Sequence, residues 1–394
     1  MEISCKLHKL SRANPEVIKG KRVMVRVDYN VPIKDGRVTD DERIRQSLPT
    51  LELLLNYNAK IILVSHLGRP KGEPKKELML NPVAECLSEL LGKRVDKLDN
   101  CIGTEVESFV AGMRAGSVVL LENTRFHKEE KANDSRFSRE LASLAEVFVF
   151  DAFATAHRAH ASVVGVQKHI KQKYIGLLVE KELNNIARVL KAAENEKPFV
   201  VVLGGAKISD KIKVIKHMAK FADQILIGGT MPFPLMKLNG LSIGKSYYED
   251  CDAAALAKIT KLSSKIRLPS DYLIAKDQAD EQAKPSNKDS IPEQAIALDI
   301  GPKTASSYAT LISQAKVVIW NGPMGYFENI VFANGTKVVA EAVAKAKYSL
   351  VGGGDTIAAI HKLAPNLAKN YTYVSTGGGA LLVLLSGEKL VALN

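Results

Sequence analysis

Short, almost wholly apolar runs recur along this chain of 394 residues, and each is followed by a glycine or polar turn and then by a longer helical pattern. Such runs are typical of strands buried on both faces, as in parallel sheets covered by helices. The runs are Val23–Val27, Ile61–Val64, Val118–Leu121, Val147–Phe150, Phe199–Leu203, Gln224–Ile227, Val317–Trp320, Tyr348–Val351 and Tyr371–Val374. The alternation predicts an α/β fold of βα units with parallel sheets, rather than a sandwich or a bundle.

A longer helical pattern separates the two halves of the chain. Residues 176–194 place Leu183, Ile186 and Leu190 at helical spacing, and Pro198 closes the segment. We interpret this segment as a helix that links two open α/β domains. Because sheets of this kind bind ligands beyond the carboxyl ends of their strands, we expect those ends to face a central cleft.

The composition narrows the class of protein. With 46% hydrophobic and 25% charged residues the chain is typical of a globular protein, and its four cysteines contain no C-x-x-C pair that would indicate a zinc site. No apolar run approaches the ~18 residues of a membrane span, and the N-terminus lacks the hydrophobic stretch of a secretory signal. We therefore expect a cytoplasmic protein that does not enter a membrane.

The chain carries a formal charge of +12. An excess of Lys and Arg is typical of phosphate binding, which could involve nucleic acid or small phosphorylated ligands. Much of the excess lies in mixed runs such as KGEPKKE and HKEEK, and no nucleic-acid module is recognisable. The charge by itself leaves DNA, RNA and small ligands open.

In the first half, cationic and polar side chains follow the strands. They are Asp28, Tyr29 and Asn30 after the first run, His66 and Arg69 after the second, Arg125 after the third and His157 and Arg158 after the fourth, with Arg43 in the loop that follows the first strand. An arginine fork matches phosphate oxygens, and a histidine adds a donor that can charge near neutrality. The pattern predicts a site for a small polyanion.

In the second half, the strands end in glycines instead. These segments are GGAKISDK at 204–211, GGT at 228–230, VGGGDT at 351–356 and STGGGA at 375–380, and none is a Walker A loop. Glycine lets backbone N–H groups approach a phosphate, so this edge predicts a nucleotide site. Lys207 and Lys211 lie near a helix start, where a lysine opposes the helix dipole, so they indicate a nearby anion. Asp355 could be an N-cap or a ligand of Mg²⁺.

At this point the sequence resembles the phosphoglycerate kinase family. The motifs RVDYNVP, SHLGRPKG, LLENTRFHKEE, DAFATAHRAHAS, LGGAKISDKI, NGPMGYFE, GGGDT and STGGGA occur in the family's order and span nearly the whole chain. The resemblance implies two Rossmann-like domains joined by the linking helix. It also implies reversible phosphoryl transfer from ATP, with Mg²⁺, to the carboxylate of 3-phosphoglycerate, giving ADP and 1,3-bisphosphoglycerate, by a cytoplasmic monomer.

The resemblance also assigns residues and boundaries. It implies a 3-phosphoglycerate domain at 1–176, the linking helix at 177–196, a nucleotide domain at 197–375 and a tail at 376–394 that returns to the first domain. The implied acceptor-binding residues are Asp28, Tyr29, Asn30, Arg43, His66, Leu67, Gly68, Arg69, Arg125 and Arg158. The implied nucleotide-binding residues are Gly204, Lys207, Lys211, Glu328, Gly353, Gly354, Asp355 and Thr356, with Asp355 as the metal ligand.

The chemistry explains why cations dominate this set. A carboxylate is already ionised at neutral pH and needs no general base, whereas repulsion between two polyanions must be cancelled. Arg43, Lys207 and Mg²⁺ on Asp355 are the candidates for that task, helped by N–H groups of Gly377 and Gly378. Three alternatives stay open here: a nucleic-acid-binding protein, a family member that binds nucleotide without catalysis, and a kinase for another phosphorylated acid.

Overall fold

The computed structural model describes residues 3–394, which divide into two compact units. The N-terminal unit comprises Ile3–Asn184 and Lys389–Asn394, and the C-terminal unit comprises Asn185–Glu388. Helix α8 (Leu177–Asn195) begins in the first unit and ends in the second. No described helix combines the length and apolar character needed to cross a bilayer.

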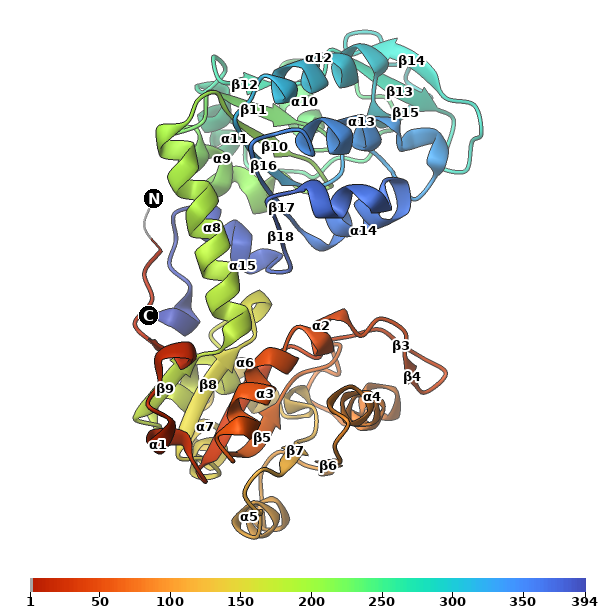
Figure 1. Ribbon diagram of the computed structural model, residues 1–394. Coiled ribbons are helices and arrows are strands. Elements are labelled where there is room, and N and C mark those ends of the chain that lie inside the picture. Colours follow the sequence, from red (N-terminus) through yellow and green to blue (C-terminus); the bar gives the residue numbers. More distant parts are fainter. Residues whose placement is uncertain (1–2) are drawn as a thin grey trace. The chain divides into compact units, whose positions relative to one another are not determined.

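The N-terminal unit contains a seven-stranded parallel sheet with the order β1-β9-β8-β2-β5-β7-β6 (Figure 1). The strands in that order are His8–Lys9, Gln172–Ile175, Val147–Asp151, Arg22–Val27, Lys60–Val64, Val118–Leu120 and Val95–Lys97. The four strands expected in this half are confirmed. The short outer strands β1, β9 and β6 were not predicted, because they carry too few apolar residues to stand out as runs.

Helices cover the N-terminal sheet. They are α1 (Pro15–Ile18), α2 (Glu42–Arg45), α3 (Leu48–Asn56), α4 (Asn81–Leu91), α5 (Thr104–Ala111), α6 (Lys128–Ala132) and α7 (Ser135–Ser143). One core cluster joins Val23 and Leu63 of the sheet to Leu51 of α3 and Val83 of α4. Two short antiparallel strands, β3 (Ile33–Lys34) and β4 (Arg37–Val38), form a hairpin that precedes α2.

The C-terminal unit has its own six-stranded parallel sheet with the order β12-β11-β10-β16-β17-β18. The strands in that order are Ile266–Arg267, Gln224–Ile227, Phe199–Leu203, Val317–Asn321, Tyr348–Gly352 and Tyr373–Ser375. The expected runs are confirmed as strands, although β18 starts two residues later than expected.

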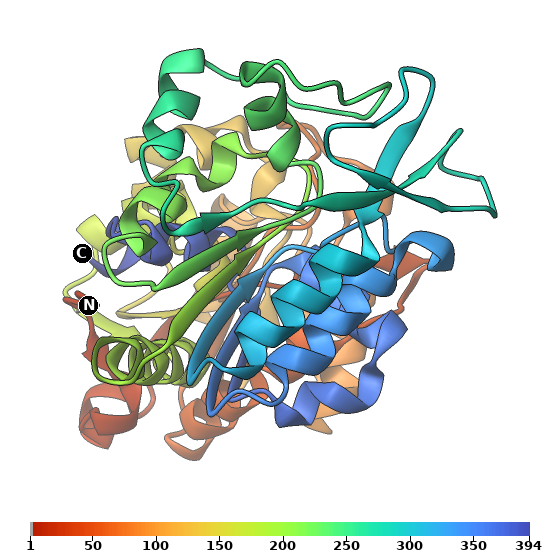
Figure 2. The same cartoon turned by 90° about the horizontal axis from the view of Figure 1, so that it is seen from above.

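Helices lie on both faces of this second sheet. They are α9 (Ile212–Met218), α10 (Pro232–Leu238), α11 (Ala253–Thr260), α12 (Pro302–Ser313), α13 (Asn334–Val343), α14 (Gly354–Leu363) and α15 (Gly379–Leu385). In Figure 2, α12, α13 and α14 lie on one side of the sheet and the green helices α9 and α11 lie on the other. Trp320 of β16 is wholly buried in the core cluster that α12 and α13 complete.

A three-stranded antiparallel sheet was not predicted from the sequence, and it is formed by residues that lie between β12 and α12 along the chain. Its order is β14 (Lys284–Asn287), β13 (Asp271–Ala275) and β15 (Ile296–Ile300). Strand β14 reads KPSN and is largely exposed, so it has no apolar run that would mark it. Its pairing depends on the neighbouring strand rather than on its own composition.

The last residues of the chain lie in the N-terminal unit. The Ala392 N–H donates to the carbonyl of Ala156 at 3.0 Å, and the Lys6 N–H donates to the carbonyl of Leu393 at 2.6 Å. Helix α15, by contrast, packs on α9 within the C-terminal unit. The end of the chain therefore supports the segment that carries Arg158.

Candidate active site

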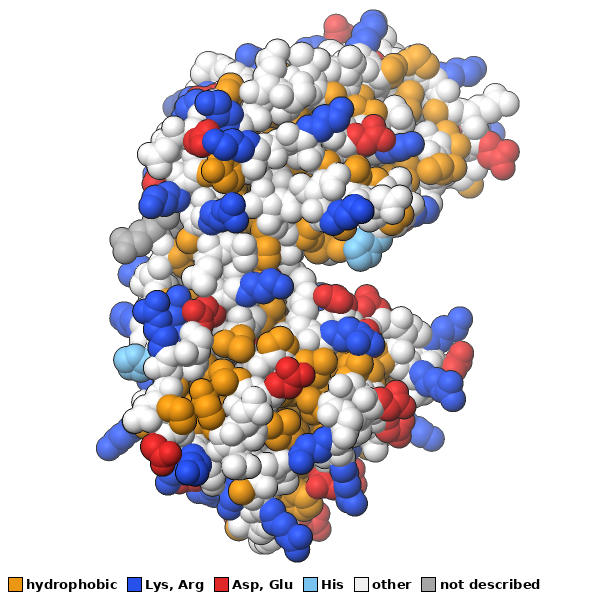
Figure 3. Space-filling view, in the orientation of Figure 1, with side chains coloured by type: hydrophobic (Ala, Val, Ile, Leu, Met, Phe, Trp, Pro, Cys, Tyr) orange, Lys and Arg blue, Asp and Glu red, His pale blue; other side chains and the backbone are white. Residues whose placement is uncertain are grey.

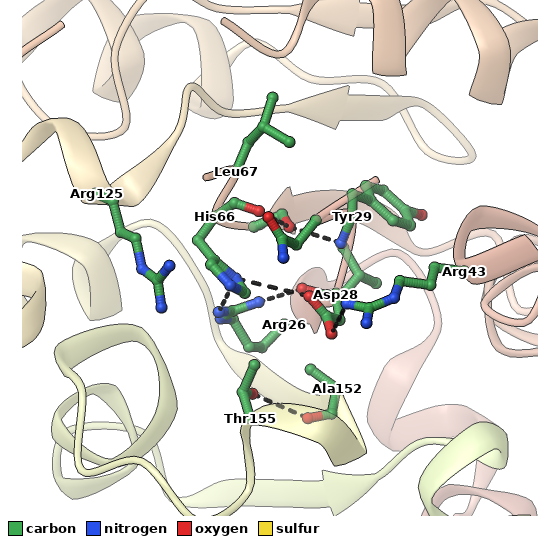
Figure 4. Close-up of polar contacts among 12 residues, drawn as sticks. Arg26, Asp28, Tyr29, Arg43, His66, Leu67, Arg125, Ala152 and Thr155 are labelled. Carbon is green, nitrogen blue, oxygen red and sulfur yellow. Dashed lines mark hydrogen bonds and ion pairs between the residues drawn. The ribbon is translucent and has the colours of Figure 1, made fainter. Parts of the chain in front are cut away.

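The carboxyl ends of the central N-terminal strands bring most of the expected acceptor-binding residues together. Asp28 follows β2, His66 follows β5, Arg125 follows β7 and Arg158 follows β8. Because neighbouring parallel strands end at the same edge of a sheet, these side chains converge although they are distant in sequence. Figure 4 shows Arg43, His66 and Arg125 arranged around Arg26 and Asp28.

Asp28 anchors Arg43. The Arg43 Nη1 donates to Asp28 Oδ2 at 2.7 Å, and the Asp28 side chain is 9% exposed whereas that of Arg43 is 39% exposed. The expected loop position of Arg43 was wrong, because Arg43 lies within helix α2. The ion pair fixes one edge of the guanidinium and leaves its other N–H groups available to a ligand.

His66 behaves differently from the expectation that it charges near neutrality. It is almost completely buried, and burial followed by the positive charge of Arg26 holds its pKa well below the usual value. The Nη2 of Arg26 lies 3.1 Å from His66 Nδ1. An arginine has only donors, so Nδ1 accepts and Nε2 carries the proton. His66 is therefore a neutral hydrogen-bond donor, which corrects the expectation.

Three arginines form a crowded cationic cluster, which we call the arginine cluster: Arg26, Arg125 and Arg158. Burial, followed by the charges of Arg158 and Arg26, lowers the pKa of Arg125 to about 10. The buried Arg125 Nε has no hydrogen-bond partner in the structure. Burial, followed by the charges of Arg125, Arg26 and Arg158, lowers the pKa of His160 to about 4. The cluster thus holds positive charge that Asp28 and Glu130 compensate only in part, and it has an unused donor, which is an arrangement suited to a bound anion.

Sequence reasoning missed Arg26. Its side chain is 1% exposed although it lies inside β2, and its Nε donates to Ser162 Oγ at 2.9 Å. Ser162 in turn donates to the buried Glu130 at 2.6 Å. The only signal was an arginine within the apolar run VMVRV, where a buried charge requires partners.

The loops that carry these side chains are tied together by Asn123, which is fully buried. Its Nδ2 donates to the carbonyls of Leu67 at 2.7 Å and Leu78 at 3.1 Å, and its Oδ1 accepts from the N–H groups of Leu67 and Arg125, both at 3.1 Å. Asn30 accepts from the N–H of Gly68 at 2.8 Å. Asn123 therefore sets the position of the 66–69 loop relative to Arg125.

The remaining expected residues of this unit divide into two kinds. Arg69 is exposed at the sheet edge. The Tyr29 side chain is fully buried and shares a 2.8 Å hydrogen bond with Ser47, and Leu67 is 3% exposed. The side chains of Tyr29 and Leu67 thus lie behind the surface, where they support the loops instead of facing a ligand.

The glycine-rich strand ends of the C-terminal unit line a cavity of about 360 Å³. Its lining includes Lys207, Lys211, Gly353, Gly354, Asp355 and Gly378. Gly204 lies beneath this lining, where an added Cβ would be 2.0 Å from the carbonyl of Pro323. The N–H of the buried Gly377 already donates to Ser375 Oγ at 3.1 Å, so this group, expected as a helper, is occupied.

Lys211 is held inside this cavity wall. It is 8% exposed, and its Nζ contacts the carbonyls of Gly204 and Asn321. Burial lowers the pKa of Lys211 to about 8, although Asp210 and Asp355 act in the opposite direction. Lys207 is exposed and also faces the cavity. The cavity therefore presents two amino groups beside glycine backbone.

Asp355 is the second residue of α14, and the N-cap position belongs to Gly353. The N-cap interpretation of Asp355 is therefore wrong. No group of three potential metal ligands exists among the described residues. A single carboxylate beside a phosphate-sized cavity fits Mg²⁺, which commonly takes one or two carboxylates and completes its shell with phosphate and water oxygens. Thr356 is buried and hydrogen-bonds Gly322 and Gly352, so it supports the loop.

A second cavity of about 460 Å³ adjoins the first, since Gly205, Ala206 and Asp355 line both. Glu328, another expected residue, lines this second cavity. Much of its remaining wall is apolar and includes Phe233, Tyr272 and Phe327. A polar cavity joined to an apolar one matches a molecule with a phosphate end and a flat apolar end.

Comparisons with known proteins identify the family of this chain. The family model for phosphoglycerate kinase matches residues 14–388. A phosphoglycerate kinase from Dictyoglomus turgidum is 50% identical over 384 residues, covering 95% of both chains, and one from Moorella thermoacetica is 47% identical over 379 residues, also covering 95% of both.

Solved structures give the same result at the level of the fold. Phosphoglycerate kinase from Coxiella burnetii superposes with a TM-score of 0.82 at 38% identity, and the match covers 98% of both chains. The enzyme from Pyrococcus horikoshii gives a TM-score of 0.81 at 31% identity. With its two parallel sheets, its arginine cluster and its paired cavities, this chain belongs to the phosphoglycerate kinase family, the kinases that transfer a phosphoryl group between ATP and the carboxylate of 3-phosphoglycerate.

Proposed function

We propose that the N-terminal unit binds 3-phosphoglycerate at the arginine cluster and that the C-terminal unit binds the nucleotide in its two adjoining cavities. The observation that carries this proposal is the excess of positive charge in the arginine cluster, where the buried Arg125 Nε has no hydrogen-bond partner and where burial, followed by the charges of Arg158 and Arg26, lowers the pKa of Arg125. A ligand with a phosphate and a carboxylate brings about three negative charges at neutral pH. Such a ligand would relieve the repulsion.

Within this site, each group has a defined task. Arg125, Arg158 and the exposed Arg69 bind the phosphate and carboxylate oxygens, while neutral His66 donates through Nε2. Arg43, oriented by Asp28 at 2.7 Å, is the cation nearest the reacting carboxylate. None of these groups needs to remove a proton, because the carboxylate is ionised at working pH. Their common effect is to cancel the repulsion that the transferred group meets.

In the nucleotide site, Lys207 and Lys211 face the phosphates, Glu328 accepts from ribose hydroxyls and the backbone of residues 353–354 approaches the phosphate chain. Gly378, which lines the same cavity, supplies its backbone N–H. Asp355 holds Mg²⁺, which when bound neutralises charge on the phosphates. The support for these assignments is the lining of the two cavities, which brings together the glycine loops that follow four different strands.

Because the two ligand sites belong to different units, transfer requires that the ligands be brought together. Helix α8 and the segment that leads into residues 389–394 connect the units, and we assign the hinge to them. Exclusion of water while the ligands meet would prevent hydrolysis of ATP. We assign the boundaries 1–176, 177–196, 197–375 and 376–394 to the acceptor domain, linking helix, nucleotide domain and tail.

We place this activity in the cytoplasm and assign it to a monomer that does not bind nucleic acid. On the face shown in Figure 3, Lys and Arg side chains are interspersed with Asp and Glu over both units instead of forming one basic stripe. Light scattering tests the oligomeric state. A gel shift at two salt concentrations tests nucleic-acid binding. Retention of DNA or RNA that depends strongly on salt would contradict this assignment.

A coupled assay with 3-phosphoglycerate and MgATP, following NADH oxidation, tests the proposal. The Arg158→Ala substitution should raise the KM for 3-phosphoglycerate about 10- to 150-fold, which corresponds to a charge-assisted hydrogen bond of about 1.5–3 kcal/mol. The KM for ATP should not change. Lys207→Ala should lower kcat far more than it raises the KM for 3-phosphoglycerate. An unaltered KM in the first variant, or an unaltered kcat in the second, contradicts the assigned roles.

A further inference from the structure

A carboxylate and a hydroxyl lie next to the arginine cluster, and no step of the proposed reaction uses them. Glu130 of α6 and Ser162, in the helical turn Ala161–Gly165, are both 0% exposed. The Ser162 hydroxyl donates to Glu130 Oε1 at 2.6 Å, and the Ser162 N–H donates to Glu130 Oε2 at 2.9 Å. Two bonds to one carboxylate fix the direction in which the hydroxyl points its proton.

This direction leaves the oxygen of Ser162 as an acceptor for Arg26. Because the hydroxyl proton is directed at Glu130, a lone pair of Ser162 Oγ accepts from Arg26 Nε at 2.9 Å. The Arg26 Nη1 donates to the carbonyl of Val27. Bonds from two different nitrogens hold the plane of the guanidinium, and its Nη2 then lies 3.1 Å from His66 Nδ1.

The charge of Glu130 is available for this chain of hydrogen bonds. His160 Nδ1 lies 3.9 Å from Glu130 Oε1, but burial and the nearby arginines lower the pKa of His160 to about 4, so its ring is neutral at pH 7. Burial lowers the pKa of Arg26, and the negative charge of Glu130, followed by that of Asp28, opposes this fall. Glu130 therefore stabilises the charged form of Arg26 as well as orienting Ser162.

His66 has an alternative partner, which shows why the placement of Arg26 matters. Asp28 Oδ1 is buried without a hydrogen-bond partner and lies 3.7 Å from His66 Nδ1. Figure 4 shows the His66 ring beside both Arg26 and Asp28. If Arg26 no longer donated to Nδ1, this nitrogen would be able to take the ring proton and donate to Asp28. Nε2 would then be an acceptor and would no longer donate to an anionic ligand.

We propose that Ser162, oriented by Glu130, is a positioning residue of the acceptor site, which acts through Arg26 to keep the ring proton of His66 on Nε2. This inference rests on the proposed acceptor site and deepens it, because Nε2–H is the group that we assign to the ligand. Ser162 and Glu130 are wholly buried, so they act through Arg26 rather than by contact with the ligand.

Ser162→Ala removes the acceptor of Arg26 Nε and should change the tautomer of His66. Nitrogen-15 NMR of the histidine side chains, recorded without ligand, should show the Nε2–H form in the parent protein and a shift toward the Nδ1–H form in the variant. The signal of His66 is the one that is absent from His66→Gln. If about a third to a thirtieth of the molecules keep the Nε2–H form, the KM for 3-phosphoglycerate rises about 3- to 30-fold. The KM for ATP should not change.

Ser138→Ala is the matched control, because it deletes another buried hydroxyl that contacts the same helical turn. Ser138 is 1% exposed, its hydroxyl donates to the carbonyl of Asp134 at 2.6 Å, and a Cβ added to Gly165 would lie 2.0 Å from Ser138 Oγ. This control should keep the parent tautomer and both KM values. Ser162→Cys is the second test variant, because it keeps the volume of the side chain while replacing the hydroxyl with a weak acceptor. It should change the tautomer in the same direction as Ser162→Ala.

An unchanged His66 tautomer in the two Ser162 variants overturns the inference, as does a parent protein in which His66 carries its proton on Nδ1. A changed tautomer with the KM for 3-phosphoglycerate at the parent value overturns the positioning role. Failure of the proposed acceptor site itself would look different. The parent protein would then show no transfer to 3-phosphoglycerate, while the tautomer, which is measured without ligand, would still respond to Ser162→Ala.

Discussion

Replacement of Asn123 by aspartate should disturb the positions of the 66–69 loop and Arg125 while leaving the ligand-binding side chains themselves unchanged. The substitution keeps the size of the side chain and keeps an acceptor for the N–H groups of Leu67 and Arg125. It removes both donated hydrogen bonds, to the carbonyls of Leu67 and Leu78. The lost bonds leave the carbonyl of the buried Leu67 and that of the half-buried Leu78 unsatisfied. At about 1–3 kcal/mol for an unsatisfied buried group, and less for the half-buried one, the total cost is about 2–4 kcal/mol. The protein should still fold, since typical domains have about 5–15 kcal/mol of stability.

The functional consequence should be confined to one substrate. If binding must first restore the 66–69 loop and Arg125 to their positions, the KM for 3-phosphoglycerate rises by about 10- to 100-fold, the equivalent of about 1.4–2.8 kcal/mol. The KM for ATP should stay at the parent value, because the nucleotide cavities lie in the other unit. Steady-state kinetics with each substrate varied in turn provides the measurement.

The control variant for this experiment is Asn81→Asp, which makes the same chemical change at an exposed position of the N-terminal unit. It should leave both KM values unchanged. The reasoning is refuted if Asn123→Asp lowers the thermal midpoint but leaves the KM for 3-phosphoglycerate at the parent value. It is also refuted if the increase in KM disappears at high salt, because simple repulsion by the new charge is screened whereas a displaced loop is not.

Three further predictions concern titration and metal. The kcat/KM for ATP should fall as pH rises through about 8, where buried Lys211 loses its proton, and Lys211→Arg should move this decline to higher pH in a pH–rate profile. Burial raises the pKa of Asp151 to about 7, so the folded state binds a proton that the unfolded state has released, and stability should fall as pH rises from about 4 through 7. The thermal midpoint of Asp151→Asn should fall less than that of the parent over this range, and an equal fall contradicts the assignment. Asp355→Asn should raise the Mg²⁺ concentration that gives half-maximal activity, and an unchanged Mg²⁺ titration curve argues against Asp355 as a ligand.

Several parts of the site were accessible from local sequence. Asp28, Arg125 and Arg158 each follow an apolar run, and the rule that ligands bind beyond the carboxyl ends of parallel strands predicts where they lie. The glycine segments before Lys207 and Asp355 were recognisable for a similar reason, because glycine permits close approach of backbone to a phosphate.

Other parts were not accessible, because their properties depend on neighbours distant in sequence. His66 resembles any titrating histidine in sequence, but contact with Arg26 and burial keep it neutral. Asn123 became a bridge only when loops from two strands met at its amide. Strand β14 has no apolar run and exists through pairing with β13.

The α/β class, the order of most strands along the chain and the family follow from local patterns, since they depend on the period of apolar residues and on the order of motifs. The folded chain was needed to show which charges are compensated, which side chains are buried and which residues line each cavity. The physical reason is that hydrogen bonding, desolvation and charge interaction act over a few ångströms in space. Residues whose charges act on one another, such as Arg26, Arg125 and Arg158, lie far apart along the chain.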